Sequence, residues 1–257
     1  MQIALIGENG FIGQAFKKQH KLVPATDADV IVFLTGRTGT DQTALVQDNV
    51  AFTAKYTQTV TKPIVFASTY AVYAGRNPYY ETSETNPTDF YGVTKLAAEG
   101  AVKVNCKRWM IARIANVYGE GDNSARLVPS AIQAILQNKP LQVSANHKTV
   151  LRDYIHVDDV VKALWTLANA TVNLEPNGIF NVGASLPISG ETLCRTIENV
   201  LKTKLKYEIT DKPTREEKRY VSINKMINHF GWQPETKLIT GINRTAQYFK
   251  DLQNQKS

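Results

Sequence analysis

The sequence predicts an α/β protein built on a mostly parallel sheet. Short apolar, β-branched runs alternate along the chain with stretches of helical period, which is typical of repeated strand–helix–strand units. An N-terminal strand runs directly into a glycine-rich turn and then into a helix. The length of 257 residues, 43% of them hydrophobic, suits one such domain or one domain with a small appendage.

Strands are expected where β-branched and aromatic residues cluster between turn residues. These runs are Gln2 to Ile6, Val30 to Leu34, Pro63 to Ala67, Trp109 to Arg113 and Gly178 to Val182. Helices are expected where apolar residues recur at helical spacing. They follow Gly10, cover about Asp48 to Thr59, start near Tyr91, cover Asp158 to Ala170, begin after Ser189, and cover Ile239 to Leu252.

Composition excludes several classes of function. The net charge of +7 comes from scattered basic residues, and no zinc finger, helix-turn-helix or aromatic RNA-binding motif accompanies them. Such a charge suits small phosphorylated substrates, so we expect no nucleic-acid partner. No apolar run is long enough to span a bilayer, and the N-terminus does not resemble a signal peptide, so a cytoplasmic protein is expected. Cys106 and Cys194 form neither a disulfide framework nor a metal-ligand cluster, and no metal is expected.

The glycine turn has the spacing Gly7-x-x-Gly10-x-x-Gly13. A strand, a tight turn and a helix bring backbone N–H groups and a helix N-terminus against a pyrophosphate. Gly7 permits the turn, Gly10 the close approach of phosphate, and Gly13 the packing of helix on strand. The spacing differs from the G-x-G-x-x-G of the standard fingerprint, but its place directly after an N-terminal strand favours a dinucleotide-binding loop.

Tyr91 and Lys95 are spaced so that both lie on one face of a helix. An ammonium group close to a phenol stabilises the phenolate and lowers its pKa from about 10. Tyr91 then becomes a usable general acid or base for a hydroxyl or a carbonyl. The spacing alone is common on solvated helices, so the pair needs its context.

That context resembles the extended short-chain dehydrogenases/reductases, the family of nucleotide-sugar epimerases, dehydratases and reductases. The resemblance begins at Gly7-x-x-Gly-Phe-Ile-Gly13 and runs through nearly the whole chain. Its further pieces are Asn49-Val50, Phe66-Ala-Ser-Thr-Tyr-Ala-Val-Tyr73, Tyr91-Gly-Val-Thr-Lys95, Arg113-Ile-Ala-Asn116-Val-Tyr-Gly119, Arg152-Asp-Tyr-Ile-His-Val-Asp-Asp159, Phe180-Asn-Val-Gly183 and Arg219-Tyr-Val-Ser-Ile-Asn-Lys225.

The resemblance implies a Rossmann-type doubly wound sheet, NAD or NADP as cofactor, and a nucleotide-diphosphate sugar as substrate. It also implies a homodimer, formed through the helix that carries Tyr91 and the one near Asn49 to Thr59. The catalytic triad would be Thr69, Tyr91 and Lys95. The cofactor would contact Gly7, Gly10, Phe11, Ile12, Gly13, Thr35, Gly36, Arg37, Tyr91 and Lys95. The substrate would contact Thr69, Asn116, Arg152 and Arg219, and arginine suits phosphate through its bidentate fork.

The chain departs from the family on the adenosine side. Only His20 to Asp29 separate the first helix from the strand at Val30, too few for the usual strand and helix. The sheet is therefore expected to be trimmed there. Asp27 has about the right count to hold the ribose 2′-hydroxyl of NAD, whereas Arg37 would suit the 2′-phosphate of NADP, so the choice of cofactor stays open.

The function expected from these features is NAD(P)-dependent epimerisation of a nucleotide sugar at C4 through a keto intermediate. Family dehydratases carry an Asp-Glu pair after the position of Thr69, and Tyr70 and Ala71 stand there instead. The alternative is a 4-keto-sugar reductase, and a non-enzymatic dinucleotide-binding regulator is disfavoured because Tyr91 and Lys95 are both kept. We expect residues 1–115, completed by about 152–182, to form the dinucleotide-binding domain, and residues 116–151 and 183–257 to form a small α/β C-terminal substrate-binding part.

Overall fold

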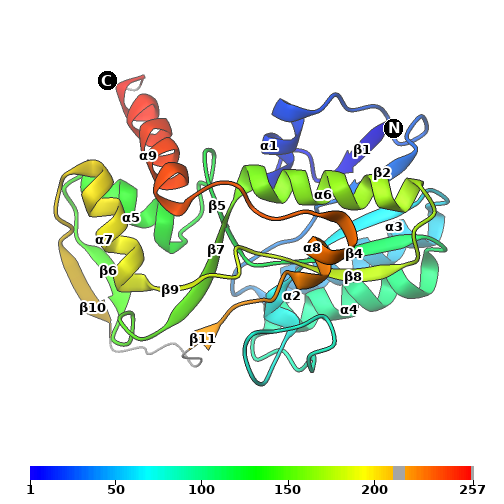
Figure 1. Ribbon diagram of the computed structural model, residues 1–257, viewed down its shortest axis with the longest axis horizontal. Helices are drawn as coiled ribbons and strands as arrows, with labels where there is room; N and C mark the ends of the chain where they lie inside the picture. Colours follow the sequence, from blue (N-terminus) through cyan, green and yellow to red (C-terminus); the bar gives the residue numbers. More distant parts are fainter. Residues whose placement is uncertain (211–217, 256–257) are drawn as a thin grey trace.

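The computed structural model describes residues 1–210 and 218–255. At its centre lies an all-parallel sheet of five strands in the order β1-β2-β3-β4-β8 (Figure 1). These strands are β1 (Ile3–Ile6), β2 (Val30–Phe33), β3 (Ile64–Thr69), β4 (Trp109–Ile114) and β8 (Gly178–Val182). The five predicted strands are thus present, with ends within two residues of the predicted ones, and the predicted α/β fold is confirmed.

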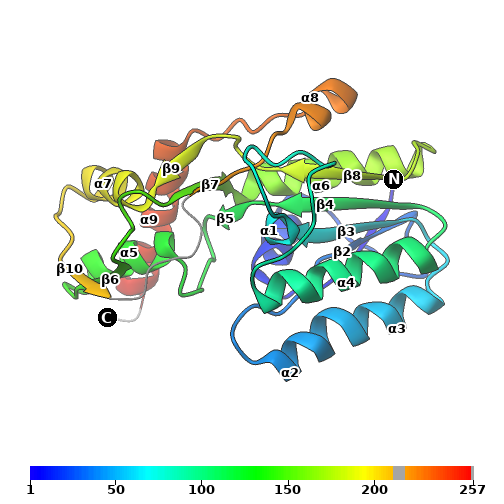
Figure 2. The same cartoon turned by 90° about the horizontal axis from the view of Figure 1, so that it is seen from below.

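Helices cover both faces of this sheet, which explains why β2 is a continuous apolar run buried along its length. Alternate residues of β2 point into two different cores. Val30 and Val32 pack with α1 (Phe11–Gln19) and α6 (Val157–Val172), and Ile31 and Phe33 pack toward α3 (Phe52–Thr59) and α4 (Phe90–Asn105). Figure 2 shows α3 and α4 side by side along the second face.

The helix near Asn49 begins earlier than the sequence predicts. A short helix α2 (Gln42–Leu45) leads into a π-helical turn η1 (Val46–Ala51), and this turn continues into α3. The Asp41 side chain accepts a hydrogen bond from the Ala44 N–H at 3.1 Å and caps the first turn. The helix was predicted to start at Asp48 because the prediction rested on the spacing of apolar residues alone and did not include the cap at Asp41.

The trimmed edge of the sheet is confirmed. Between α1 and β2, one residue, Leu22, pairs with Ile3, and the Val23 N–H donates to the Ile3 carbonyl at 3.0 Å. The chain then turns back, and the Asp29 N–H donates to the carbonyl of Gln2 at 2.9 Å. This single bridge stands where a full strand would lie, so β1 is the last regular strand on that side of the described sheet.

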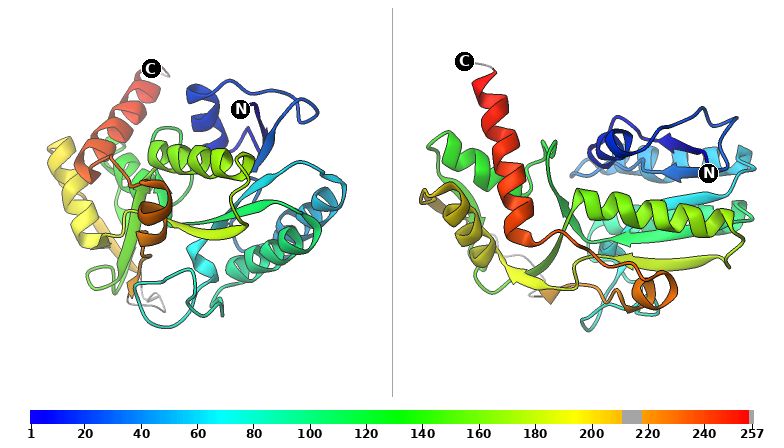
Figure 3. Two further views of the ribbon diagram at one scale, coloured as in Figure 1. Left: turned by 45° about the vertical axis from the view of Figure 1, so that its right-hand side comes forward. Right: turned by 45° about the horizontal axis from the view of Figure 1, so that its top comes forward.

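A smaller α/β part is built from later segments of the chain (Figure 3). One of its sheets holds β5 (Asn116–Tyr118), β7 (Leu151–His156), β9 (Pro187–Ser189) and β11 (Lys218–Arg219), and the other pairs β6 (Leu141–Ser144) with β10 (Tyr207–Thr210). The helices α5 (Leu127–Leu136), α7 (Gly190–Leu201) and α9 (Leu238–Asn254) pack beside them around a separate core.

Two features join the smaller part to the large sheet. Helix α8 (Asn224–Phe230) packs on β8, where the Phe230 and Phe180 rings lie 5.1 Å apart between centroids. The His156 side chain, at the end of β7, caps α6 by accepting from the Asp158 N–H at 3.2 Å. In the described part of the chain, no helix combines the length and apolar character that a bilayer crossing requires.

Candidate active site

The glycine turn lies at the carboxyl end of β1 and has the shape of a phosphate cradle. Gly7 has φ +95°, in the left-handed region, and a Cβ there would lie 2.9 Å from the Thr35 nitrogen. A Cβ on Gly13 would lie 2.5 Å from the Gly7 carbonyl oxygen. The first N–H groups of a helix have no intrahelical acceptor, and at the start of α1, at Phe11, no side chain caps them. These features fit a dinucleotide pyrophosphate.

The loop after β2 forms the neighbouring wall. The Thr35 hydroxyl is buried and, among the described residues, has no hydrogen-bond partner, which suits a bound ligand that reaches it. A Cβ on Gly36 would lie 3.3 Å from the Lys95 ammonium nitrogen. The glycine turn, this loop and Lys95 therefore lie together, as the sequence predicts for a cofactor channel.

Arg37 is tied to the turn η1 through both its backbone and its side chain. Its backbone N–H donates to the Asn49 carboxamide oxygen at 2.7 Å, and its carbonyl accepts from the Asn49 amide at 3.0 Å. Its guanidinium forms an ion pair with Asp48 of η1. Asn49 also donates to the Thr94 hydroxyl of α4 at 2.9 Å, so it ties this loop to the helix that carries Lys95.

Asp27, the other residue considered for cofactor choice, lies near the amino end of β1. It belongs to a turn closed by its own N–H to the Pro24 carbonyl at 3.0 Å. Two residues later the chain is bonded to Gln2, which precedes β1, whereas the glycine turn follows β1. Asp27 therefore lies at the opposite end of β1 from the glycine turn.

The three predicted catalytic residues converge at the carboxyl end of β3. Thr69 is the last residue of that strand, and its side chain lies close enough to the Tyr91 phenol to lower the pKa of Tyr91. Tyr91 lies in the first turn of α4, which Asp89 caps by accepting from the Gly92 N–H at 2.7 Å. Lys95 follows one turn later, only 2% exposed, with its ammonium nitrogen 4.1 Å from the centroid of the Phe66 ring.

The electrostatics of this group differ from the expectation. Burial raises the pKa of Tyr91 to about 12, although the nearby Thr69 side chain and the positive charge of Arg126 both lower it. Burial lowers the pKa of Lys95 to about 7, against the negative charge of Glu99. The expected lowering of the Tyr91 pKa by Lys95 is therefore wrong for the protein as described. Desolvation outweighs the effect of nearby charge on both groups.

Glu99 is a buried carboxylate close to the three predicted catalytic residues, and it was not predicted from the sequence. Glu99, one turn after Lys95, accepts from Arg113 at 3.0 and 2.7 Å and from the Ser68 hydroxyl at 2.6 Å. The Arg113 guanidinium carbon also lies 4.6 Å from the centroid of the Tyr73 ring. The signal was available, because Glu99 stands four residues after Lys95 and Ser68 directly precedes Thr69.

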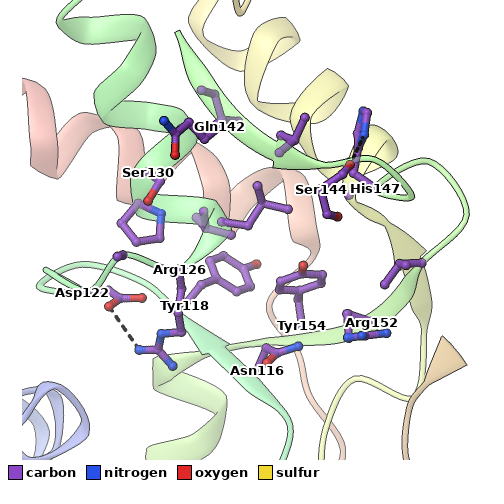
Figure 4. A pocket seen from close by; sticks show the side chains of 18 of the residues that line it. Asn116, Tyr118, Asp122, Arg126, Ser130, Gln142, Ser144, His147, Arg152 and Tyr154 are labelled. Atoms are coloured by element: carbon purple, nitrogen blue, oxygen red, sulfur yellow. Dashed lines mark hydrogen bonds and ion pairs between the residues drawn. The ribbon is translucent and has the colours of Figure 1, made fainter. Parts of the chain in front are cut away.

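A pocket of about 360 Å³ opens in the smaller part of the molecule (Figure 4). The loop after β5, helix α5 and strands β6 and β7 enclose it. Two of the predicted substrate residues, Asn116 and Arg152, line it, and Figure 4 shows both along one edge. Its polar lining also includes Asp122, Arg126, Ser130, Gln142, Ser144 and His147.

The third predicted substrate residue, Arg219, lies beside this pocket. It is the register partner of Arg152 across the β11–β7 pair, and its guanidinium donates to the Thr88 hydroxyl at 3.1 Å. Tyr70 lies against the same group. Its hydroxyl accepts from the Asn116 amide at 2.6 Å, and the Arg219 guanidinium carbon is 5.7 Å from the centroid of its ring. Sequence reasoning considered Tyr70 only as a residue that cannot replace a carboxylate.

Comparisons with known proteins find a family and relatives that match most of the chain. The model of the NAD dependent epimerase/dehydratase family matches residues 14–183. A dTDP-D-glucose 4,6-dehydratase from Mus musculus is 27% identical over 75% of this chain and 57% of its own length. UDP-glucuronate 4-epimerase 1 from Arabidopsis thaliana is 28% identical over 72% of this chain and 48% of its own. The chain thus spans about half the length of these relatives.

A solved structure shows the same fold at low sequence identity. The structure of RMD from Pseudomonas aeruginosa complexed with NADPH superposes with a TM-score of 0.85. The two sequences are 19% identical, and the match covers 98% of this chain and 99% of the other.

Proposed function

The chain belongs to the NAD dependent epimerase/dehydratase family, and from this membership we propose that it is an NAD(P)-dependent nucleotide-sugar epimerase that acts at C4 through a keto intermediate. The observation that carries the proposal is the meeting of Thr69 and Tyr91, with Lys95 one helical turn away, between the glycine turn and the pocket lined by Asn116 and Arg152. The proposed division of the chain is a dinucleotide-binding part of residues 1–115 and about 152–182, with a substrate-binding part made by the rest.

The cofactor would be held by the glycine turn, the loop after β2 and the catalytic helix. A nicotinamide dinucleotide bound there supplies the acceptor and donor of hydride. The residues that would hold it are Gly7, Gly10, Phe11, Ile12, Gly13, Thr35, Gly36, Arg37, Tyr91 and Lys95. The fit is supported by the free helix N-terminus at Phe11 and by the unpartnered Thr35 hydroxyl among the described residues.

The residues of the chain divide the remaining work. Tyr91 would take the proton of the reacting hydroxyl and later return it, and Thr69 would hold the same oxygen in line with the phenol. The Lys95 ammonium would orient the ribose next to the nicotinamide. Asn116, Arg152 and Arg219 would bind the diphosphate of the substrate. Dehydration is not supported, because Tyr70 and Ala71 supply no carboxylate beside Thr69.

A 4-keto-sugar reductase is a second candidate that two observations favour. The pKa of Tyr91 is raised to about 12, so its phenol is protonated at neutral pH and ready to donate a proton. The sheet ends at β1 on the adenosine side, which favours a cofactor that is released after each cycle over one that is retained.

One experiment separates these two functions. The protein would be incubated with NAD, NADP or their reduced forms and with UDP-, dTDP-, GDP- and CDP-sugars and 4-keto-sugars, and followed by absorbance and NMR. The epimerase proposal expects a C4 epimer to appear without net change in the absorbance of reduced cofactor. Stoichiometric loss of that absorbance with a 4-keto-sugar would identify the reductase. No response to either dinucleotide would remove both proposals.

We also propose that the protein is a cytoplasmic homodimer, joined through η1, α3 and α4. The support is apolar surface on these helices, because Phe52 is 42% and Val93 is 45% exposed. Light scattering of the purified protein tests the assembly, and a monomer at micromolar concentration would contradict it.

A further inference from the structure

Tyr70 directly follows Thr69 and lies among hydrogen-bond donors. The Asn116 amide donates to its hydroxyl at 2.6 Å. The Arg219 guanidinium carbon lies 5.7 Å from the centroid of its ring, and Arg152 is close enough for its positive charge to act on the phenol. Three donor-bearing side chains therefore lie near the Tyr70 side chain, and one of them, Asn116, is bonded to its hydroxyl.

The side chains around the Tyr70 hydroxyl offer more hydrogen-bond donors than acceptors. A phenol both accepts and donates, whereas an arginine side chain only donates. Among the described residues, the Asn116 amide is the one hydrogen-bond partner of the Tyr70 hydroxyl, and it uses the accepting side of that oxygen. Burial raises the pKa of Tyr70, so the phenol keeps its proton. The O–H is left as a donor in a cationic neighbourhood, which is where an anion would bind.

The position of Tyr70 specifies which part of a ligand this anion would be. Asn116 and Arg152 line the 360 Å³ pocket, so the pocket reaches the group from one side. Thr69, whose side chain lies near the Tyr91 phenol, is the chain neighbour of Tyr70. A ligand that spans the two would place at Tyr70 its segment between the nucleoside and the reacting sugar carbon, where a diphosphate stands in a nucleotide sugar.

We propose that Tyr70 is a substrate-binding residue whose hydroxyl donates a hydrogen bond to the sugar-bearing phosphate of the nucleotide diphosphate. This inference rests on the proposed function, because that function supplies the diphosphate. Tyr70 occupies the position where a dehydratase carries a carboxylate, and in this protein it would bind phosphate instead. It would hold the Asn116 amide and the phosphate at once, close to Arg152 and Arg219.

The test compares Tyr70→Phe with Tyr73→Phe as a matched control. The Tyr73 hydroxyl donates to the Asn181 carboxamide oxygen at 2.7 Å and is buried, so its removal also costs a buried tyrosine–asparagine hydrogen bond. Tyr73 is bonded to Asn181, which does not line the pocket, whereas Tyr70 is bonded to Asn116, which does. Calorimetry would measure the Kd of the di- and monophosphates of uridine, thymidine, guanosine and cytidine for the wild type and both variants. Thermal unfolding would establish that each variant is folded.

The expected result is specific to the second phosphate. For the diphosphate that binds the wild type, the Kd rises about tenfold in Tyr70→Phe, as expected for loss of a hydrogen bond to a charged group. It stays within about twofold in Tyr73→Phe, and the monophosphate Kd changes by less than about twofold in both.

Three outcomes would overturn the inference about Tyr70 alone, and a fourth would overturn the proposed function as well. An unchanged diphosphate Kd in Tyr70→Phe rejects it, and so does an equal loss for the mono- and diphosphate, which would mean that Tyr70 only shapes the pocket. An equal loss in Tyr73→Phe would assign the effect to the fold. If the wild type binds none of the four diphosphates, the proposed function fails together with the inference.

Discussion

Glu99 lies one helical turn after Lys95 on α4, and its carboxylate interacts with both the Lys95 ammonium and the Arg113 guanidinium. Burial lowers the pKa of Lys95 to about 7, and the negative charge of Glu99 opposes this effect. The same carboxylate accepts from the Arg113 guanidinium at 3.0 and 2.7 Å. One buried group thus serves both a structural ion pair and the candidate catalytic lysine.

Glu99→Gln should destabilise the protein by about 3–5 kcal/mol, because it leaves the Arg113 guanidinium buried without its counter-charge. Urea unfolding followed by far-UV circular dichroism measures the loss. The double variant Glu99→Gln/Arg113→Met removes both charges and should recover much of the free energy of unfolding. If the double variant instead loses the sum of the two single changes, Glu99 and Arg113 are not energetically coupled.

The pH dependence of stability should report the low pKa of Lys95. Between about pH 7 and 10.5 the folded state has released the Lys95 proton and the unfolded state has kept it, so wild-type stability gains with rising pH in this window. Below pH 7 both states are protonated and the full cost of the buried charge is present. The stability advantage of Lys95→Met over the wild type should therefore shrink from pH 7 to 9, by at most about 1.4 kcal/mol per pH unit.

Lys103→Met is the control for this measurement. Lys103 also lies near Glu99, with 3.8 Å between its ammonium nitrogen and the carboxylate, but its side chain is about one-third exposed. Its substitution should give a stability difference that changes little from pH 7 to 9. A Lys95→Met difference equally independent of pH would show that Lys95 titrates near its ordinary pKa.

Tyr91→Phe should reduce kcat by about 100- to 10,000-fold, because it removes the phenol that would exchange a proton with the substrate oxygen. The phenyl ring retains the packing, so thermal stability should change little. Tyr80→Phe, at a tyrosine that is 48% exposed in the loop before α4, is the control and should keep wild-type activity. Turnover of Tyr91→Phe at the wild-type rate would remove Tyr91 from the catalytic role.

The backbone of this site was predictable because it depends on local sequence signals. The glycine turn, the five strands and the i, i+4 spacing of Tyr91 and Lys95 are all determined within a few residues. Even the trimmed edge followed from a count, since the residues between α1 and β2 are too few for a strand and a helix.

The electrostatics were not predictable, because they depend on residues that meet only in the fold. The sign of the Tyr91 pKa shift is set by burial, which spacing does not reveal. The bonds of Arg37 to Asp48 and Asn49 join residues 11 and 12 positions apart in the sequence, so they also have no local signal. Tyr70 is 46 residues from Asn116, so their hydrogen bond has no local signal.

Gly13→Ala should weaken dinucleotide binding, because the new Cβ would lie 2.5 Å from the Gly7 carbonyl oxygen and 2.7 Å from the Glu8 Cα, both backbone atoms. The turn must move apart to admit the methyl group, at a cost of about 1–3 kcal/mol, which corresponds to roughly a tenfold to hundredfold rise in Kd if the cost falls on the bound state. Gly100→Ala is the matched control on α4. A Cβ there meets nothing within 4 Å, and alanine in a helix interior should add about 0.5–1 kcal/mol of stability. Tryptophan fluorescence titration with NAD and NADP measures both variants, and an unchanged Kd in Gly13→Ala would place the dinucleotide elsewhere.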